Sequence, residues 1–288
     1  MNKQELSALI GQILKEMDVS TDTPQMPQDS AGEIPDITQM DLRKLYLTEK
    51  PQNADAYRAL KARTPARLGS GRAGARYKTL TMLRFRADHA AAQDTVFAQV
   101  PPEFAKGHGY IPVQTRCTDK DEYLTRPDLG RVFDEENAAI IRNAYPTPPK
   151  VLLVVGDGLS SAAVQANAPD CLSAILQGLK LRGVEPGKIL FVRYARVGAG
   201  DAIGDITGCE LVCMLVGERP GLVTDKSMSA YLTYRPHTGV SESARTVVSN
   251  IHAQGTPAME AGAHIAELIG KILEKKVSGV ALTRGAGA

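Results

Sequence analysis

A run of six apolar residues at 211–216 stops at Gly217. A run this short, ended by a turn residue, is typical of a strand that is buried on both faces. Glu218 and Arg219 follow immediately, and the turn pair Pro220-Gly221 comes next. Because ligands of open parallel sheets bind at the carboxyl ends of the strands, we predict that this pair of charges stands at a ligand-facing edge. The alternative is an ordinary surface loop with a local ion pair.

The C-terminal half of the chain contains other short apolar runs of the same kind. Further strands are predicted at 151–155, 189–194 and 230–234. Ser160 or Ser161 is placed to cap a helix between the first two of these strands. The apolar stripe of that helix consists of Leu172, Ile175, Leu176 and Leu179.

A last helix is predicted to begin at Thr256-Pro257, where a capping residue precedes a first-turn proline. Its apolar stripe consists of Ile265, Leu268, Ile269, Ile272 and Leu273. Strands that alternate with helices imply right-handed crossovers and a mostly parallel sheet. We therefore predict an α/β fold, with a mostly parallel sheet domain over 108–284 that follows a helical region at 37–107.

The first 36 residues are predicted to form an amphipathic helix followed by a linker. Asn2 and Glu5 stand at capping-box spacing, ahead of an apolar stripe made of Leu6, Leu9, Ile10, Ile13, Leu14 and Met17. Residues 18–36 contain three prolines among polar residues and read as a flexible linker. A helix of residues 1–17 that is isolated in this way is marginal alone in water and needs a partner surface. That surface is either its own domain or, as the long linker favours, a docking or encapsulation target.

Nine basic residues and no acidic one lie between Arg58 and Arg86. A Gly-rich loop at 69–74 interrupts the helical pattern within this block. The block is compatible with nucleic-acid binding. Aromatic residues are few around it and the whole chain has a net charge of only +2, so an acidic protein partner, a phosphate group or a solvated face remains an alternative.

Residues 108–149 connect the two regions. Asp128 is predicted to cap a helix that runs through Glu135, Ala138 and Ile141, and prolines at 146, 148 and 149 mark a boundary. The last four residues, 285–288, read as a flexible tail.

The cysteines indicate a reducing compartment. Cys117, Cys171, Cys209 and Cys213 include no C-x-x-C pair, so neither a disulfide framework nor a zinc site is predicted. No apolar run approaches the length of a membrane span, and the N-terminus lacks the pattern of a secretory signal. We therefore predict an intracellular protein without membrane contact.

A dinucleotide site is the first hypothesis that the predicted sheet suggests. Gly156 and Gly158 follow a strand and precede a helix, as that site requires. The third glycine of the motif would fall at Ser161, and the second strand ends in residues 193–196, Arg-Tyr-Ala-Arg, without the acid that binds ribose. The turn is thus present without the residues that recognise NAD. A stand-alone nucleotide-dependent enzyme remains the alternative function.

No self-contained active site emerges from the sequence. None of the five histidines has zinc-ligand spacing with another histidine or with a cysteine. There is no G-x-S-x-G elbow and no Walker loop. We predict no catalytic and no metal-ligating residue, and a scaffold whose loops hold a group that the chain does not itself transform.

Several strings resemble the small subunit of ethanolamine ammonia-lyase. The most specific are Phe-Val-Arg-Tyr-Ala-Arg-Val at 191–197, Leu-Val-Gly-Glu-Arg-Pro-Gly-Leu at 215–222 and Ser-Asn-Ile-His-x-x-Gly-Thr-Pro at 249–257. Further matches lie, in the same order as in that family, at 71–76, 87–89, 123–131 and 157–160. The resemblance extends from about residue 58 to Arg284.

The resemblance implies an adenosylcobalamin-dependent lyase that converts ethanolamine to acetaldehyde and ammonia. A larger partner subunit, built on a TIM-type barrel, would hold the substrate and the catalytic residues. The small subunit would contribute a Rossmann-like domain that covers part of the cobalamin at the interface, in an assembly with six copies of each subunit. The N-terminal segment resembles those that deliver enzymes into a bacterial microcompartment, which together with the cytoplasm is the expected location.

Carried over by position, the resemblance places cobalamin contacts at Val197, Glu218 and Val247, with Arg196 as an addition. The family often has a cysteine where this chain has Val247, which puts a role for the sulfur in doubt. A carboxylate that accepts amide N–H groups and small apolar surfaces suit a ligand with amide side chains, while the cofactor itself supplies the radical. All three contacts are expected to follow a strand end or a helix and to share one cleft.

Overall fold

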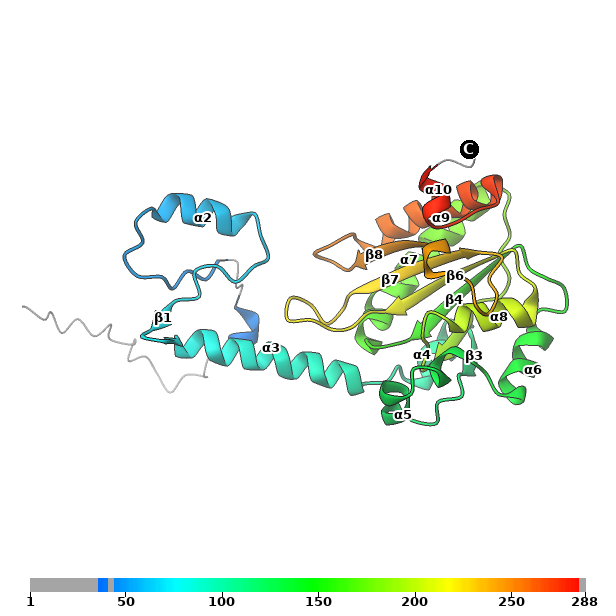
Figure 1. Ribbon diagram of the computed structural model, residues 1–288, viewed down its shortest axis with the longest axis horizontal. Helices are drawn as coiled ribbons and strands as arrows, with labels where there is room; N and C mark the ends of the chain where they lie inside the picture. The colour runs from blue at the N-terminus through cyan, green and yellow to red at the C-terminus, as the bar shows by residue number, and fades with distance from the viewer. Residues whose placement is uncertain (1–35, 41–43, 285–288) are drawn as a thin grey trace, which may run out of the picture. The chain divides into compact units, whose positions relative to one another are not determined.

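The computed structural model of the protein describes residues 36–40 and 44–284 (Figure 1). The chain divides into two units, Met1–Gln39 and Met40–Ala288. The first unit is described only at its end, where η1 (Ile37–Gln39) is a 3-10 helix. The predicted helix at 1–17, nearly all of the predicted linker and the tail at 285–288 lie outside the described residues.

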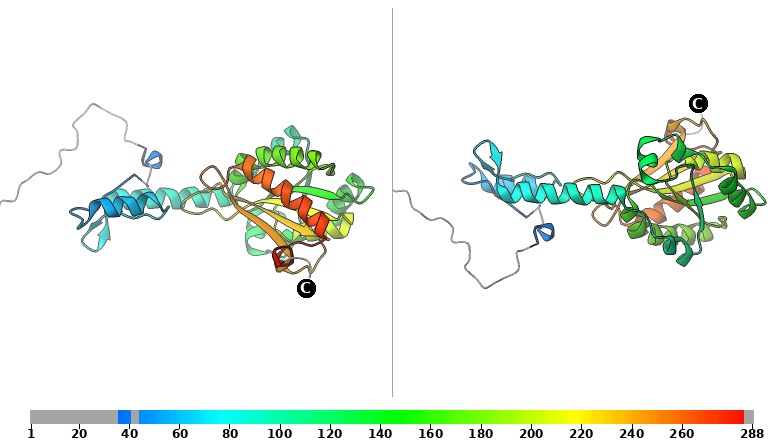
Figure 2. Two further views of the ribbon diagram at one scale, coloured as in Figure 1. Left: turned by 90° about the horizontal axis from the view of Figure 1, so that it is seen from above. Right: turned by 90° about the horizontal axis from the view of Figure 1, so that it is seen from below.

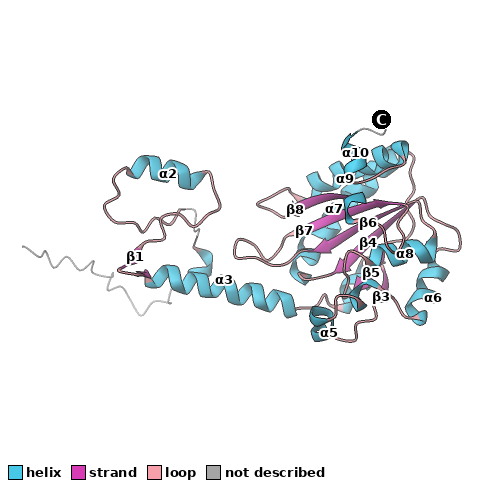
Figure 3. Cartoon of the chain, viewed as in Figure 1, coloured by secondary structure: helices cyan, strands magenta, loops and turns pink. Residues whose placement is uncertain are grey.

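The second unit begins with helices and a small hairpin. Its helices are α2 (Ala54–Ala62), α3 (Thr79–Phe97) and α4 (Pro102–Gly107). The Gly-rich interruption forms an antiparallel hairpin of β1 (Arg72–Ala73) and β2 (Arg76–Tyr77). Gly74 occupies the turn with a φ of +62°, a left-handed conformation that glycine adopts at little cost. The prediction of a mostly helical region with a glycine-rich break is confirmed (Figure 3).

A six-stranded sheet forms the centre of the unit, in the order β3-β5-β4-β6-β7-β8. The strands are β3 (Ile111–Gln114), β4 (Val151–Asp157), β5 (Leu190–Arg193), β6 (Leu211–Gly217), β7 (Met228–Tyr234) and β8 (Arg245–Ile251). The first four in this spatial order are parallel, whereas β7 runs antiparallel to both of its neighbours. The predicted α/β fold with a mostly parallel sheet is confirmed.

Helices cover both faces of this sheet (Figures 1 and 2). On one face, α7 (Ser161–Leu181) and α9 (Ala258–Lys275) pack on the odd-numbered residues of β4 and β6, such as Val155 and Leu215. On the other face, α6 (Glu135–Ala144) and α8 (Ala199–Thr207) pack on the even-numbered residues, such as Val154 and Met214. Both faces of β4 and β6 are therefore buried, which explains their unbroken apolar runs.

The remaining elements are short. They are α5 (Lys120–Thr125), the 3-10 helices η2 (Leu129–Arg131) and η3 (Glu242–Ala244), and α10 (Val280–Arg284). Among the described helices, none is both long enough and apolar enough to cross a membrane.

Three details differ from the sequence prediction. The side chain that caps α6 is Asp134, which accepts from the Asn137 N–H at 2.8 Å, whereas Asp128 instead pairs with Arg126. The last long helix begins one residue later than predicted, with Pro257 as its N-cap residue. The strands β3 and β8 were not predicted, because β3 has four residues and contains a proline, and β8 is largely exposed.

Candidate functional site

The carboxyl ends of β4, β5 and β6 meet at one edge of the sheet. The chain leaves β4 towards α7 on one face, and it leaves β5 towards α8 on the opposite face. Open α/β sheets bind ligands where successive connections diverge in this way. Val197 lies between β5 and α8, and Glu218 directly follows β6. The fold thus places two predicted contacts at the edge where a ligand is expected.

The turn after β4 is built for packing and not for a dinucleotide. A Cβ atom added to Gly158 would lie 2.7 Å from a methyl group of Val216. The buried Asp157 carboxylate accepts from the Val100 N–H at 3.0 Å and from the Ser161 hydroxyl at 2.6 Å, and burial raises its pKa. The Asp157 carboxylate thus bonds to the first side chain of α7, and Ser160 caps that helix by accepting from the Ala163 N–H, at the helix end where a dinucleotide site would bind its pyrophosphate. This arrangement disfavours the alternative of a nucleotide-dependent enzyme.

Glu218 is oriented by a tyrosine on the neighbouring strand. The Tyr231 hydroxyl donates to Glu218 Oε1 at 2.7 Å, and the Glu218 N–H donates to the Ser227 carbonyl at 2.9 Å. The next residue, Arg219, is exposed. The carboxylate is therefore held over β7, with lone pairs left to accept from a ligand.

A cavity of about 480 Å³ opens around Glu218, between the β6–β7 loop and the end of β8. Most of its lining residues have polar side chains, and the whole lining consists of Glu218, Arg219, Gly221, Leu222, Val223, Thr224, Ser227, Ser229, Tyr231, Ser249, Asn250 and His252. Ser229 Oγ is buried and has no hydrogen-bond partner within the described part of the chain. Neither Val197 nor Val247 lines this cavity.

Val247 lies in the middle of β8, where it pairs with Tyr231. The expectation that this contact follows a strand end or a helix is therefore wrong, since β8 went unrecognised. The Val247 side chain is 47% exposed, and it shares a sheet face with Tyr231 because the two are direct cross-strand partners. Tyr231 thus contacts Glu218 on one side and neighbours Val247 on the other.

Arg196 fixes the turn that carries Val197. Its guanidinium donates to the Tyr123 carbonyl at 2.7 Å and lies 4.3 Å from the centre of the Tyr123 ring. Its backbone N–H donates to the Gly130 carbonyl at 2.9 Å. Val197 itself is partly exposed. Arg196 is partly exposed as well, and its guanidinium has partners within the protein, although its Nε is buried without one among the described residues.

An ion pair connects the Val197 turn to the strand of Val247. The Arg245 guanidinium donates to both carboxylate oxygens of Asp201, at 2.8 and 2.7 Å, and both side chains are largely buried. Asp201 lies in the first turn of α8, four residues after Val197, and Arg245 precedes Val247 by two residues. The predicted positions are therefore linked through Arg245 and Tyr231. Sequence reasoning missed both, although the alternation of polar and apolar residues along β7 marks Tyr231 as part of a polar face.

The cysteines add no reactive group to this edge. All four cysteines are free and buried, and burial raises the pKa of Cys171 to about 12. Within the described residues, no group of three His, Cys, Asp or Glu side chains is placed to hold a metal ion.

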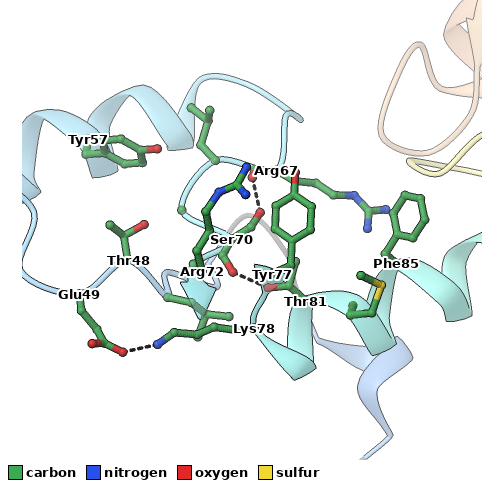
Figure 4. Close-up of a pocket in the computed structure, with 15 residues that line it drawn as sticks. Thr48, Glu49, Tyr57, Arg67, Ser70, Arg72, Tyr77, Lys78, Thr81 and Phe85 are labelled. Atoms are coloured by element: carbon green, nitrogen blue, oxygen red, sulfur yellow. Dashed lines mark hydrogen bonds and ion pairs between the residues drawn. The ribbon is translucent and has the colours of Figure 1, made fainter. Parts of the chain in front are cut away.

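Most cations of the basic block between Arg58 and Arg86 form hydrogen bonds or ion pairs within the protein. Six of its nine cations have partners, which are Arg58, Lys61, Arg67, Arg72, Lys78 and Arg84. Figure 4 shows Lys78 directed at Glu49 beside a cavity of about 720 Å³. Arg67 binds Asp88 at 2.7 Å and also the Leu222 carbonyl at 2.9 Å, in the loop that follows Glu218. Structural pairing explains most of this charge without a nucleic acid.

Comparisons with known proteins show which family the chain belongs to. Residues 54–283 match the family profile described as Ethanolamine ammonia-lyase light chain (EutC). A Clostridioides difficile protein named ethanolamine ammonia-lyase small subunit is 55% identical over 292 residues, which cover 98% of this chain and 100% of that protein. A Clostridium perfringens protein of the same name is 54% identical over 296 residues, with the same coverage of both chains. The chain therefore belongs to the ethanolamine ammonia-lyase small-subunit family.

Proposed function

We propose that this chain is the small subunit of an adenosylcobalamin-dependent lyase that converts ethanolamine to acetaldehyde and ammonia. Its role in that enzyme is to bind part of the cobalamin at the interface with the large subunit, which carries the catalytic residues. The observation that supports this role best is the Glu218 carboxylate, which Tyr231 orients at the carboxyl edge of the sheet beside a cavity.

The residues at this edge fit a corrinoid. Cobalamin supplies the radical chemistry when it is bound, and the protein supplies orientation and exclusion of water. Glu218 accepts an amide N–H group, and the exposed methyl groups of Val247 and the partly exposed Val197 offer apolar surface. For Arg196 we propose an indirect contribution, since its guanidinium holds the Val197 turn through Tyr123.

The exposed apolar surface supports a large protein partner. Leu60, Leu83, Phe85 and Phe97, on α2 and α3, are each more than 40% exposed. Exposed large apolar side chains, where they gather in a patch, mark surfaces that bind a partner protein. We propose that the large, TIM-barrel subunit covers this surface, in an assembly with six copies of each subunit. We further propose that residues 1–17 direct the enzyme to a microcompartment shell, and that without a shell it resides in the cytoplasm.

Co-expression with the large subunit tests the proposal. Gel filtration and a corrinoid absorbance titration should show a complex that binds cobalamin. Glu218→Ala should weaken that binding about 10- to 100-fold, because a hydrogen bond to a charged group contributes about 1.5–3 kcal/mol. Glu218→Gln, which keeps an acceptor oxygen, should lose less.

Glu103→Ala, which changes an exposed residue, serves as the matched control, and its complex should bind cobalamin as the wild type does. A wild-type complex that takes up no corrinoid would overturn the proposal as a whole. Unchanged affinity in Glu218→Ala would remove Glu218 from the contact.

A further inference from the structure

The loop between β6 and β7, residues 218–227, has few hydrogen bonds of its own. The Glu218 N–H donates to the Ser227 carbonyl at 2.9 Å where the loop begins and ends, and the Gly221 N–H donates to the Thr224 carbonyl at 3.0 Å in a turn between them. Connecting loops are more mobile than the elements they join unless other contacts hold them. The position of this turn therefore depends on side chains from other parts of the chain.

Arg67, from the segment between α2 and α3, supplies the contact at this turn. One nitrogen of its guanidinium, Nη2, donates both to the Leu222 carbonyl at 2.9 Å and to the Asp88 carboxylate at 2.7 Å. Asp88 also accepts from Arg84 Nε at 2.9 Å, and the side chains of Arg67 and Asp88 are only 23% and 14% exposed. Because charged hydrogen bonds are short and directional, the two acceptors hold the Arg67 guanidinium in one orientation against the loop.

Helix α3 presents a polar face to the loop. Arg84, Asp88 and Thr95 lie on one side of this helix, since they are spaced by four and by seven residues. The Thr95 hydroxyl donates to the Asp225 carboxylate at 3.2 Å, and the Asp225 carbonyl accepts from the Ser160 hydroxyl at the start of α7. Among the described residues, the apolar core clusters contain no side chain of α3. Hydrogen bonds, and not apolar burial, therefore set the position of the loop against this helix.

We propose that Arg67 is a positioning residue, which Asp88 holds in place and which fixes the β6–β7 loop in its cofactor-binding conformation. The proposal rests on the cobalamin-binding function, and it adds a residue that acts through the loop and makes no contact with the cofactor. A ligand binds in proportion to the fraction of molecules whose site is already in the competent conformation. Arg67 raises that fraction for the loop that begins with Glu218. One cation of the basic block thereby has a role in binding.

Hydrogen exchange of the full-length chain, without the large subunit, tests the contact directly. In Arg67→Ala the amide hydrogens of Glu218 and Gly221 should exchange about 10-fold faster, because the loop loses a hydrogen bond from a charged donor and opens more easily. The core amides of β4 should exchange as in the wild type, whereas a general loss of stability would accelerate them too. Asp88 keeps its second arginine partner in this variant, so the chain should still fold. Arg86→Ala, which removes an exposed cation from the same block, is the matched control and should change no exchange rate.

The complex with the large subunit tests the effect on the cofactor. Arg67→Ala should lower the cobalamin affinity in an absorbance titration about 3- to 10-fold, in proportion to the loss of competent loops. At saturating cobalamin its kcat and its KM for ethanolamine should equal those of the wild-type complex, because Arg67 takes no part in substrate binding or in the reaction. Arg67→Lys keeps a positive charge opposite Asp88 on a shorter side chain without the planar guanidinium. It should shift the exchange rates and the affinity in the same direction by a smaller amount.

Three results would overturn the positioning role. Wild-type exchange rates at Glu218 and Gly221 in Arg67→Ala would show that Arg67 does not hold the loop. Wild-type cobalamin affinity in that variant would show that holding the loop does not affect the cofactor, and equal acceleration of the loop and of β4 would assign Arg67 to overall stability. A wild-type complex without corrinoid uptake would instead reject the underlying function, while the exchange test on the free chain would still decide whether Arg67 holds the loop.

Discussion

At the scale of single residues, Tyr231 does most to organise the edge of the sheet. Its hydroxyl holds Glu218, and its backbone pairs with Met214 on one side and Val247 on the other. The hydrogen bond to the carboxylate is one cause of the raised pKa of this tyrosine, after burial. The phenol therefore stays protonated and remains a donor throughout the neutral range.

Tyr231→Phe should lower the cobalamin affinity of the complex about 3- to 10-fold, because Glu218 loses the group that orients it. Stability should change by less than about 1 kcal/mol, because the carboxylate that loses its partner can be solvated from the cavity. Absorbance titration and urea unfolding measure the two effects. Tyr77→Phe, at an exposed ring, is the control. Equal affinities of wild type and Tyr231→Phe would contradict the orienting role.

Asp157 gives a prediction for pH. Burial raises its pKa, although Ser161, the Val100 N–H and Lys120 act against that shift. The folded chain therefore holds this proton at a higher pH than the unfolded chain does. The stability that comes from the protonated form is lost as the pH rises above the ordinary aspartate value of about 3.9.

Asp157→Asn should remove this loss. The amide can still accept from the Val100 N–H, and it can donate to the Ser161 hydroxyl, which also donates to the Ala98 carbonyl. In urea unfolding, the advantage of the Asn variant over the wild type should grow from pH 4 towards neutrality and then level off, within the roughly 1.4 kcal/mol per pKa unit that linkage allows. A constant difference at every pH would show that Asp157 does not titrate in this way.

At the scale of elements, the Arg245–Asp201 pair joins α8 to β8 and so sets the geometry between the Val197 turn and Val247. The guanidinium side chain is 3% exposed, and Glu242 supplies a second carboxylate at 2.8 Å. Removing one member of such a buried pair leaves the other as an uncompensated charge.

Arg245→Ala should therefore destabilise the chain by about 3–5 kcal/mol in urea unfolding. Arg142→Ala breaks the solvent-exposed pair with Glu135 and should cost less than about 1 kcal/mol. If both substitutions cost the same small amount, the Arg245 pair does not hold α8 in place.

Local sequence patterns predict some of these elements and miss others. The strands β4, β5 and β6 were predictable as apolar runs, and the buried stripes of α7 and α9 were predictable from their helical period. The strand β8 was not, because its seven residues are buried only at the two ends, and the five between them are partly buried or exposed. Its run Thr-Val-Val, which is β-branched, was the available signal.

At the scale of the whole molecule, the cavity beside Glu218 and the exposed Val247 face outward, whereas the apolar core is closed by α6–α9. A chain that keeps the Glu218 cavity open to solvent and large apolar side chains exposed on α2 and α3 is suited to work within a larger assembly.

Deleting residues 1–17 tests how the first segment contributes to that assembly. The truncated complex should keep full activity and cobalamin affinity, because the site lies within 40–288, while co-sedimentation with shells should be lost. The full-length complex, prepared in parallel, is the control. Loss of activity in the purified truncated complex would contradict a targeting role.

The sequence alone determined the α/β class, the buried strands and the placement of Glu218 at a strand end, because these depend on periodicities of a few residues. Only the tertiary structure decided which side chains act with Glu218. Tyr231 reaches it through the antiparallel register of β7 on β6, and Arg245 meets Asp201 across 44 residues of chain. Such contacts arise from strand pairing between distant segments, which no local pattern encodes.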